Sequence, residues 1–131
     1  MLNLWFLLTI LAAAPTAPSA PTPAPVAQTV ADPGARAFQR CAACHSVRAN
    51  AHDDIGPNLR DVFGRRVGAV SGYPYSDSLR AAGRRGMVWN ATTLDRFLAD
   101  PEAAIPGTAM PYQGGSAAER AALIAWLRRT G

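Results

Sequence analysis

The sequence predicts an all-α fold with three to five short helices and long loops. No segment alternates apolar and polar residues with the period of two that a half-buried strand shows. Several short segments instead place apolar residues at helical spacing, and glycine and proline residues separate them. The chain has 131 residues, of which 49% are hydrophobic. This length and composition suit one compact domain with a small core.

The first residues are expected to lie outside that domain. An apolar run of about 13 residues, Leu2 to Ala14, is too short to cross a bilayer, which needs roughly 20 residues. It has the length of the apolar region of a signal peptide, and small residues follow at Pro18 to Ala20. We therefore expect a signal peptide over 1–20, a Pro/Ala-rich linker over 21–32 and the folded domain over 33–131. No basic residue precedes the run, so an uncleaved anchor remains the alternative. Either reading predicts a periplasmic or otherwise extracytoplasmic protein.

The first helix of the domain is expected to open at Pro33 and Gly34. Phe38, Cys41, Ala42 and His45 follow at spacings of 0, 3, 4 and 7, which places them on one helix face. The motif CAACH, residues 41–45, is therefore expected to close this helix. Residues 50–72 contain several glycines and read as a loop.

Three further helices are expected after this loop. A short one is expected over 76–82. The next begins at Thr92, whose spacing to Asp95 is that of a capping box, and ends before Pro101. Residues 102–115 read as a Pro/Gly loop. A second capping box, Ser116 to Glu119, opens the last helix. The apolar stripe of that helix consists of Leu123, Trp126 and Leu127.

The CAACH motif contains both cysteines of the chain and one of its two histidines. A thioredoxin-like redox site would require a βαβ setting, which the pattern lacks. A structural zinc site requires four ligands, and the other histidine, His52, is poorly spaced for that role. A disulfide across two residues would constrain little of the unfolded chain. The remaining use of C-x-x-C-H is covalent attachment of haem, with His45 beneath the iron.

A second axial iron ligand would have to come from elsewhere in the chain. Met110 lies in a loop between Pro106 and Pro111, which is stiff enough to direct a side chain, whereas Met87 lies in a Gly/Arg-rich turn. Core packing is the commoner fate of a methionine. The proline-bounded context nevertheless favours Met110 as the ligand, and a thioether ligand raises the reduction potential.

Over about residues 34–129 the chain resembles a class I cytochrome c of the mitochondrial and bacterial c2 type. The matching segments occur in the family's order: GARAFQRCAACHSV, GPNLRDVFGR, GYPYSD, a tryptophan at position 89, FLADPEAAIPGTAMPY and ERAALIAWL. The resemblance implies a cytochrome c fold around one covalently bound haem c per chain.

The resemblance also implies residue roles. Cys41 and Cys44 match the cysteines that form thioethers, and His45 and Met110 match the axial ligands. Pro57 matches the residue whose carbonyl orients the histidine. The remaining matches concern the haem environment. Arg65, Tyr75 and Trp89 stand at positions that hydrogen-bond the propionates. Thr108 lies in the segment IPGTAMPY, residues 105–112, which we call the methionine loop. Phe97 stands where many members have a tyrosine that bonds the methionine sulfur.

The charge pattern argues against a nucleic-acid partner. The net charge is +4, every one of the 13 basic residues is arginine, and no aromatic interleaving accompanies them. Mitochondrial members carry a ring of lysines around the haem edge, but here Glu102, Ala103 and Ala109 occupy three of those sites. About three extra residues lie between Tyr75 and Trp89, in a segment that includes Arg84 and Arg85.

The function that follows is an exported monohaem cytochrome that carries single electrons and is not an enzyme. The implied partners are redox proteins: a donor of the quinol–cytochrome c reductase type and an acceptor of the terminal oxidase or dehydrogenase type. A monomer is expected, and peripheral association with a membrane is left open. The alternative is a cytochrome subunit tethered to a dehydrogenase or oxidase complex.

Overall fold

The computed structural model describes residues 32–52, 55–112 and 114–131. Within these ranges the secondary structure is helical, and the only pairing of extended segments is an isolated bridge between Arg66 and Val88. The helices are α1 (Pro33–Phe38), α2 (Asp77–Arg84), α3 (Ala91–Ala99), α4 (Pro101–Ala104) and α5 (Ala117–Leu127). The all-α prediction is confirmed.

No helix in the described ranges is both long and apolar enough to cross a bilayer. The predicted signal peptide and almost all of the predicted linker fall on residues 1–31, which lie outside the described part of the chain. The linker's last residue, Asp32, is described as the N-cap of α1.

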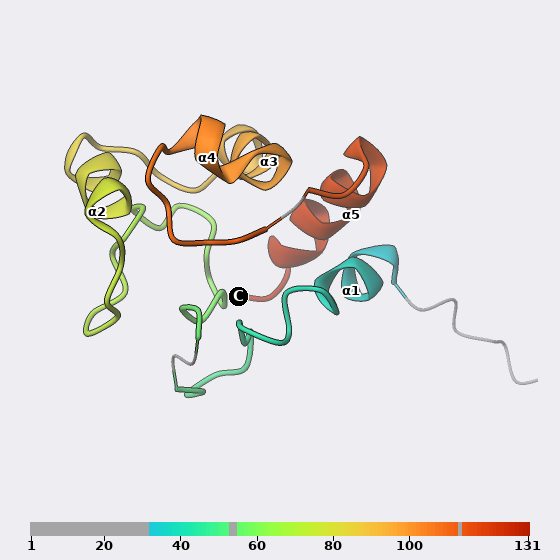
Figure 1. Ribbon diagram of the computed structural model, residues 1–131. Coiled ribbons are helices and arrows are strands. Elements are labelled where there is room, and N and C mark those ends of the chain that lie inside the picture. Colours follow the sequence, from blue (N-terminus) through green and yellow to red (C-terminus); the bar gives the residue numbers. More distant parts are fainter. Residues whose placement is uncertain (1–31, 53–54, 113) are drawn as a thin grey trace, which may run out of the picture.

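The helices surround a central region that loops occupy (Figure 1). Helices α1 and α5 lie side by side on one flank, α3 and α4 lie above, and α2 lies on the opposite flank. The segment between α4 and α5 runs across the middle, above the segment that follows α1. This arrangement places the methionine loop opposite the segment that contains CAACH.

Helix α1 begins as predicted. Asp32 is its N-cap and accepts a hydrogen bond from the backbone N–H of Gly34 at 2.8 Å, and Pro33 occupies the first turn. Gly34 permits close approach to α5, because a Cβ at this position would lie 2.2 Å from Cβ of Trp126. The rings of Phe38 and Trp126 then pack with centroids 4.8 Å apart. This contact joins the two ends of the domain.

The start of α3 differs from the prediction. Its capping box pairs Asn90 with Thr93, rather than Thr92 with Asp95: each side chain accepts a hydrogen bond from the other's backbone N–H. The cap therefore lies two residues earlier than expected, and the helix ends at Ala99, before Pro101 as predicted. Helix α2 has Ser76 as its N-cap and extends two residues beyond the predicted end.

Helix α4 was not predicted, because residues 102–115 were expected to form a loop. Asp100 caps this short helix by accepting a hydrogen bond from the N–H of Ala103, and Pro101 has a favourable place at its first position. Proline thus both ends α3 and opens α4. The predicted capping box of α5 is confirmed, with Ser116 and Glu119 bonded to each other's backbone N–H.

The buried apolar residues form two clusters. The first joins α1, α3 and α5 and consists of Phe38, Val62, Leu94, Leu98, Leu123, Ile124 and Leu127. The second lies on the α2 side and consists of Val67, Leu79, Ala82, Phe97 and Ile105. Helix α3 contributes to both clusters, from different faces. The described part of the chain contains no fully buried polar or charged residue.

Candidate haem site

The CAACH segment follows α1 as a series of tight turns. The regular helix ends at Phe38, so the prediction that CAACH closes this helix is wrong in its boundary. Helix-like hydrogen bonds nevertheless continue, from Ala42 N to Phe38 O at 3.0 Å and from His45 N to Cys41 O at 2.8 Å. These bonds bring Cys41, Cys44 and His45 into one compact turn.

His45 lies against a backbone carbonyl, the contact that the family resemblance implies. Its Nδ1 atom lies 2.8 Å from the carbonyl oxygen of Pro57. Nδ1 must carry the proton to donate to that carbonyl, and this tautomer leaves Nε2 with a free lone pair. Burial lowers the pKa of His45, and the hydrogen bond to Pro57 partly opposes that shift. The histidine is thus prepared as a neutral ligand.

Gly56 is required beside this histidine. A Cβ at Gly56 would lie 2.4 Å from Cε1 of His45, which is closer than real contacts allow. The N–H of Gly56 also donates to the carbonyl of Cys44 at 2.8 Å. Sequence reasoning identified this glycine only as a loop breaker. No local signal predicted its contact with His45, because the two residues meet through the fold.

Both cysteines are free thiols in this structure and partly accessible. Burial raises the pKa of the Cys41 thiol, an effect that nearby Arg40 partly offsets and that Cys44 reinforces. Since no disulfide joins the two sulfur atoms, both remain available for thioether formation. The described residues contain no group of three or more His, Cys, Asp or Glu side chains that could hold a metal ion.

Met110 lies where the two apolar clusters meet. It is partly buried and packs against both of them, as does Trp89. The Trp89 ring also packs against Phe97 with centroids 5.1 Å apart. A cavity of about 200 Å³ adjoins the methionine loop, and its lining includes Thr108, Met110 and Tyr112. Met87, the other methionine of the folded domain, contacts only the second cluster.

Thr108 supplies the clearest polar signal near this loop. Its hydroxyl oxygen is buried and has no hydrogen-bond partner among the described residues. A buried hydroxyl without a partner carries a desolvation penalty of about 1–3 kcal/mol. The resemblance assigns this residue to the haem environment, and the unpaired hydroxyl is consistent with a polar group of a cofactor beside it.

Arg65 and Tyr75 make contacts that sequence reasoning did not foresee. The Arg65 guanidinium donates to the carbonyl of Asn58 at 2.7 Å and to that of Arg60. These two bonds stabilise the loop that contains Arg65. A guanidinium has five N–H donors, so Arg65 has more donors than these two bonds use. The Tyr75 ring packs edge-on against Tyr73 at 4.7 Å, and the Tyr73 hydroxyl donates to Ile55 O at 2.6 Å.

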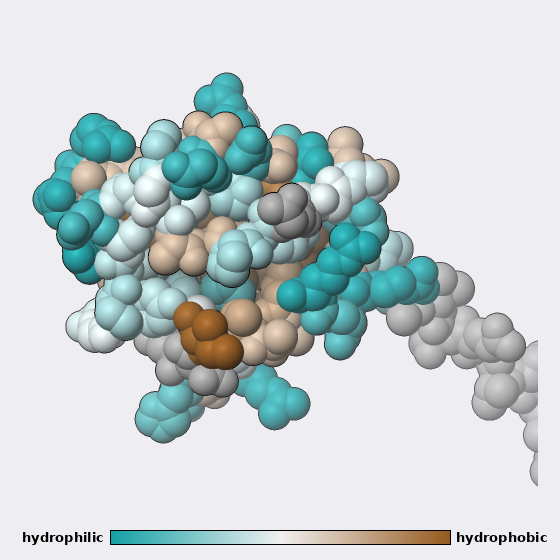
Figure 2. All heavy atoms as spheres, in the orientation of Figure 1, coloured by the Kyte–Doolittle hydropathy of each residue, from teal (hydrophilic) through white to brown (hydrophobic). Residues whose placement is uncertain are grey.

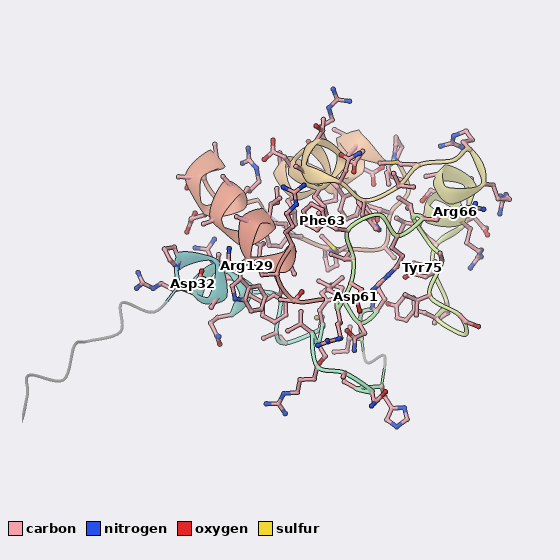
Figure 3. All side chains as sticks on the ribbon, turned by 180° about the vertical axis from the view of Figure 1, so that it is seen from behind. Asp32, Asp61, Phe63, Arg66, Tyr75 and Arg129 are labelled. Atoms are coloured by element: carbon pink, nitrogen blue, oxygen red, sulfur yellow. The ribbon has the colours of Figure 1, made fainter. Side chains whose placement is uncertain are left out.

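Tyr75 lies on the α2 side of the molecule, well away from the pair formed by Asp32 and Arg129 (Figure 3). The propionate contacts of Arg65, Tyr75 and Trp89 remain predictions.

The residues present fit a covalently attached haem. Two free thiols and an oriented neutral histidine lie in one turn, the loop opposite carries a partly buried thioether, and an unpaired hydroxyl lies two residues before it. Sulfur and imidazole nitrogen are also the donor set of c-type haem iron. A structural zinc site fits poorly, because four ligands do not converge within the part of the chain that the structure describes.

Known proteins are similar over this same region. The family model for cytochrome c matches residues 31–131. Cytochrome c-550 of Ancylobacter novellus is 40% identical over 62% of this chain and 76% of its own length. Cytochrome c2 iso-2 of Magnetospirillum fulvum is 41% identical over 70% of this chain and 93% of its own length.

A solved structure, cytochrome cH from Methylobacterium extorquens, superposes with a TM-score of 0.63 and 36% identity, and covers 73% of this chain and 94% of its own. The chain therefore belongs to the cytochrome c family, which implies a covalently bound haem c and electron transfer as its function.

Proposed function

We propose that this chain is an exported one-electron carrier in which Cys41 and Cys44 hold the haem and His45 and Met110 are its axial ligands. The observation that carries this proposal is the hydrogen bond between His45 and Pro57 within the turn that also holds both thiols. When bound, the haem supplies an iron atom that changes by one electron between its ferrous and ferric states.

The protein's own residues determine how such a group would behave. The hydrogen bond from His45 Nδ1 to Pro57 fixes the ring orientation and increases the donor strength of Nε2. Met110 offers a thioether, a soft ligand that favours the reduced iron. If His45 and Met110 both bound the iron, no position on the metal would remain open to a substrate, and this arrangement supports a carrier rather than an enzyme.

The charge distribution supports redox proteins as partners but not a strongly basic dock at the methionine loop. Asp100 and Glu102 line the cavity beside Met110, and no arginine lies between residues 97 and 119. Arg40, near the CAACH turn, is paired with Glu119 at 3.1 Å. In Figure 2 the middle of the visible face is largely pale, with strongly hydrophilic residues mainly toward its edges. We infer recognition through a weakly charged face.

The proposed location rests on the N-terminal sequence and on the family resemblance. The apolar N-terminal run and the resemblance to cytochrome c2 support an extracytoplasmic carrier between membrane-bound or periplasmic redox enzymes.

Two measurements test the proposal. Haem should stay with the polypeptide after denaturation, and its pyridine haemochrome spectrum should be of the c type; a b-type spectrum would contradict thioether attachment. Met110→Ala should lower the reduction potential and allow imidazole or azide to bind the ferric iron.

Met87→Ala is the matched control for the second measurement. It removes a methionine side chain that packs on the second apolar cluster. Because this side chain is only partly buried, the loss of unfolding free energy should be about 2 kcal/mol, at the low end of the usual range, and iron ligation should be unchanged. If Met110→Ala behaves like Met87→Ala, Met110 is not the ligand.

A further inference from the structure

The methionine loop begins with a defined turn. The N–H of Thr108 donates to the carbonyl of Ile105 at 3.1 Å. Pro106 and Gly107 occupy the two central positions, and Gly107 has φ +82°. Proline followed by a residue with positive φ is the signature of a type II β-turn, which strongly favours glycine at the second position. This turn ends two residues before Met110.

Glu102 binds the centre of this turn. Both of its carboxylate oxygens lie within hydrogen-bond distance of the backbone N–H of Gly107, at 3.0 and 3.1 Å. The turn's own hydrogen bond does not use this N–H. Glu102 is placed by α4, which Pro101 opens and Asp100 caps. The helix that the sequence did not predict thus positions a carboxylate against the loop.

Few other contacts hold the turn on its outer side. Ile105 is 3% exposed and anchors the start of the loop in the second cluster, and Met110 is partly buried at its end. Between them, Pro106, Gly107 and Ala109 are exposed. A Cβ at Gly107 would meet only Ser78, at 3.7 Å, which is ordinary contact. The hydrogen bond to Glu102 therefore restrains the most exposed part of the segment between two buried anchors.

We propose that Glu102 is a positioning residue that latches the 105–108 turn and thereby holds Met110 toward the haem iron. This inference rests on the proposed role of Met110 as ligand. A loop that opens more often would release the thioether more often, and an external ligand would then compete more effectively for the iron. Glu102 occupies a position where the resemblance expects lysine, a residue that could not accept this hydrogen bond.

The test uses the ferric holoprotein and two substitutions. Glu102→Ala removes the acceptor and the charge, whereas Glu102→Gln removes the charge but keeps an acceptor oxygen. We expect Glu102→Ala to speed amide hydrogen exchange at Gly107 about five- to tenfold, the effect of losing one hydrogen bond to a charged acceptor at the surface. Imidazole affinity should rise by a similar factor. In Glu102→Gln, both the exchange rate of Gly107 and the imidazole affinity should stay close to their wild-type values.

Asp77→Asn is the control for lost negative charge. The Asp77 side chain is 98% exposed, pairs with Arg80, and makes no hydrogen bond or ion pair with the methionine loop. It should leave the exchange of Gly107 and the imidazole affinity unchanged. If it produces the same rise in imidazole affinity as Glu102→Ala, net charge rather than the latch is responsible, and the proposal is overturned.

Other results separate the latch from the proposed function. Unchanged exchange at Gly107 in Glu102→Ala overturns the latch. Faster exchange without a change in imidazole affinity also overturns it, because the turn would then not govern Met110. Failure of the ligand assignment would appear independently, as a Met110→Ala variant with unaltered imidazole affinity and potential.

Discussion

The Nδ1 atom of His45 lies 2.8 Å from the carbonyl oxygen of Pro57. Gly56, the residue before Pro57, has no room for a side chain beside the histidine ring. Gly56→Ala would place a methyl group 2.4 Å from Cε1 of His45. We expect a loss of about 1–3 kcal/mol in unfolding free energy, the usual range for overpacking, together with a lower yield of haem-bearing protein. Denaturant unfolding and the ratio of haem to protein absorbance measure these effects.

Gly64→Ala is the control for this substitution. A Cβ there would meet no atom within 4 Å, although φ is +77°. It should cost only the strain of a left-handed residue, about 1–2 kcal/mol, and leave haem content unchanged. Equal haem yields in the two variants would show that crowding at His45 does not affect haem attachment.

The pairing of Glu119 predicts a specific loss of stability in acid. Hydrogen bonding with the backbone and the side chain of Ser116, together with the nearby Arg40, holds the pKa of Glu119 below its usual value of 4.5. A depressed folded-state pKa contributes stability that is present above pH 4.5 and is lost as the pH falls through the folded pKa. Wild type should therefore be more stable than Glu119→Gln at pH 7, and the difference should shrink below pH 4.5.

Arg40→Gln separates the two causes of this pH dependence. It removes the ion pair but leaves the capping box of α5, so most of the acid-dependent difference should remain. Guanidinium unfolding curves at several pH values measure it. A difference between wild type and Glu119→Gln that stays constant down to pH 3 would contradict the assignment.

Electron transfer to a physiological partner should depend only modestly on ionic strength. Helix α4 carries Glu102 and Ala103, and the methionine loop carries Ala109, where the resemblance expects lysines, and Arg40 is already paired. Exposed charges are screened beyond about 8–10 Å at ordinary ionic strength, so few edge charges give a shallow dependence. Stopped-flow rates between low and moderate salt measure it. A steep fall would point to Arg84 and Arg85, and Arg84→Gln with Arg85→Gln would then flatten it.

The absence of lysine predicts an unusual response to alkali. In related cytochromes a lysine from the methionine loop commonly replaces the thioether at high pH, but this chain has none. Arginine remains protonated, because its pKa exceeds about 12. We therefore expect the thioether to be retained to higher pH than in lysine-bearing relatives. Magnetic spectroscopy of the ferric protein during a pH titration measures it.

Only hydroxide, His52 or the N-terminal amine could take the methionine's place. His52 lies in the segment between His45 and Gly56 and is exposed. Loss of sulfur ligation at mildly alkaline pH, giving a nitrogen-ligated product that survives both His52→Ala and acetylation of the amine, would contradict this argument.

Local chemistry explains which features could be predicted from sequence. The CAACH spacing, the helix start at Pro33 and Gly34 and the Ser116–Glu119 capping box each depend on residues within one or two turns, so the pattern carries the necessary information. The same reasoning chose Thr92 as a cap because its spacing to Asp95 is acceptable. The actual cap, Asn90, was missed because threonine at the third helical position can replace the usual glutamate.

The remaining features depend on distant contacts. Helix α4 is too short for its pattern to be distinguished from a Pro/Gly loop, and the contact of Glu102 with Gly107 follows from that helix. Gly56 beside His45 and Gly34 beside Trp126 depend on segments that meet only in the folded chain. The family resemblance supplied residue roles that these patterns alone could not.

The contact between α1 and α5 also constrains the order in which the protein can fold. Gly34 and Phe38 meet Trp126, about 90 residues later in the chain, so this interface closes a very long loop. A chain made or exported from its N-terminus cannot complete this contact until its last turn has emerged. Until then α1 lacks its partner, and the thiols of Cys41 and Cys44 follow an undocked segment. Both sulfur atoms are therefore less restrained before this contact closes than after it.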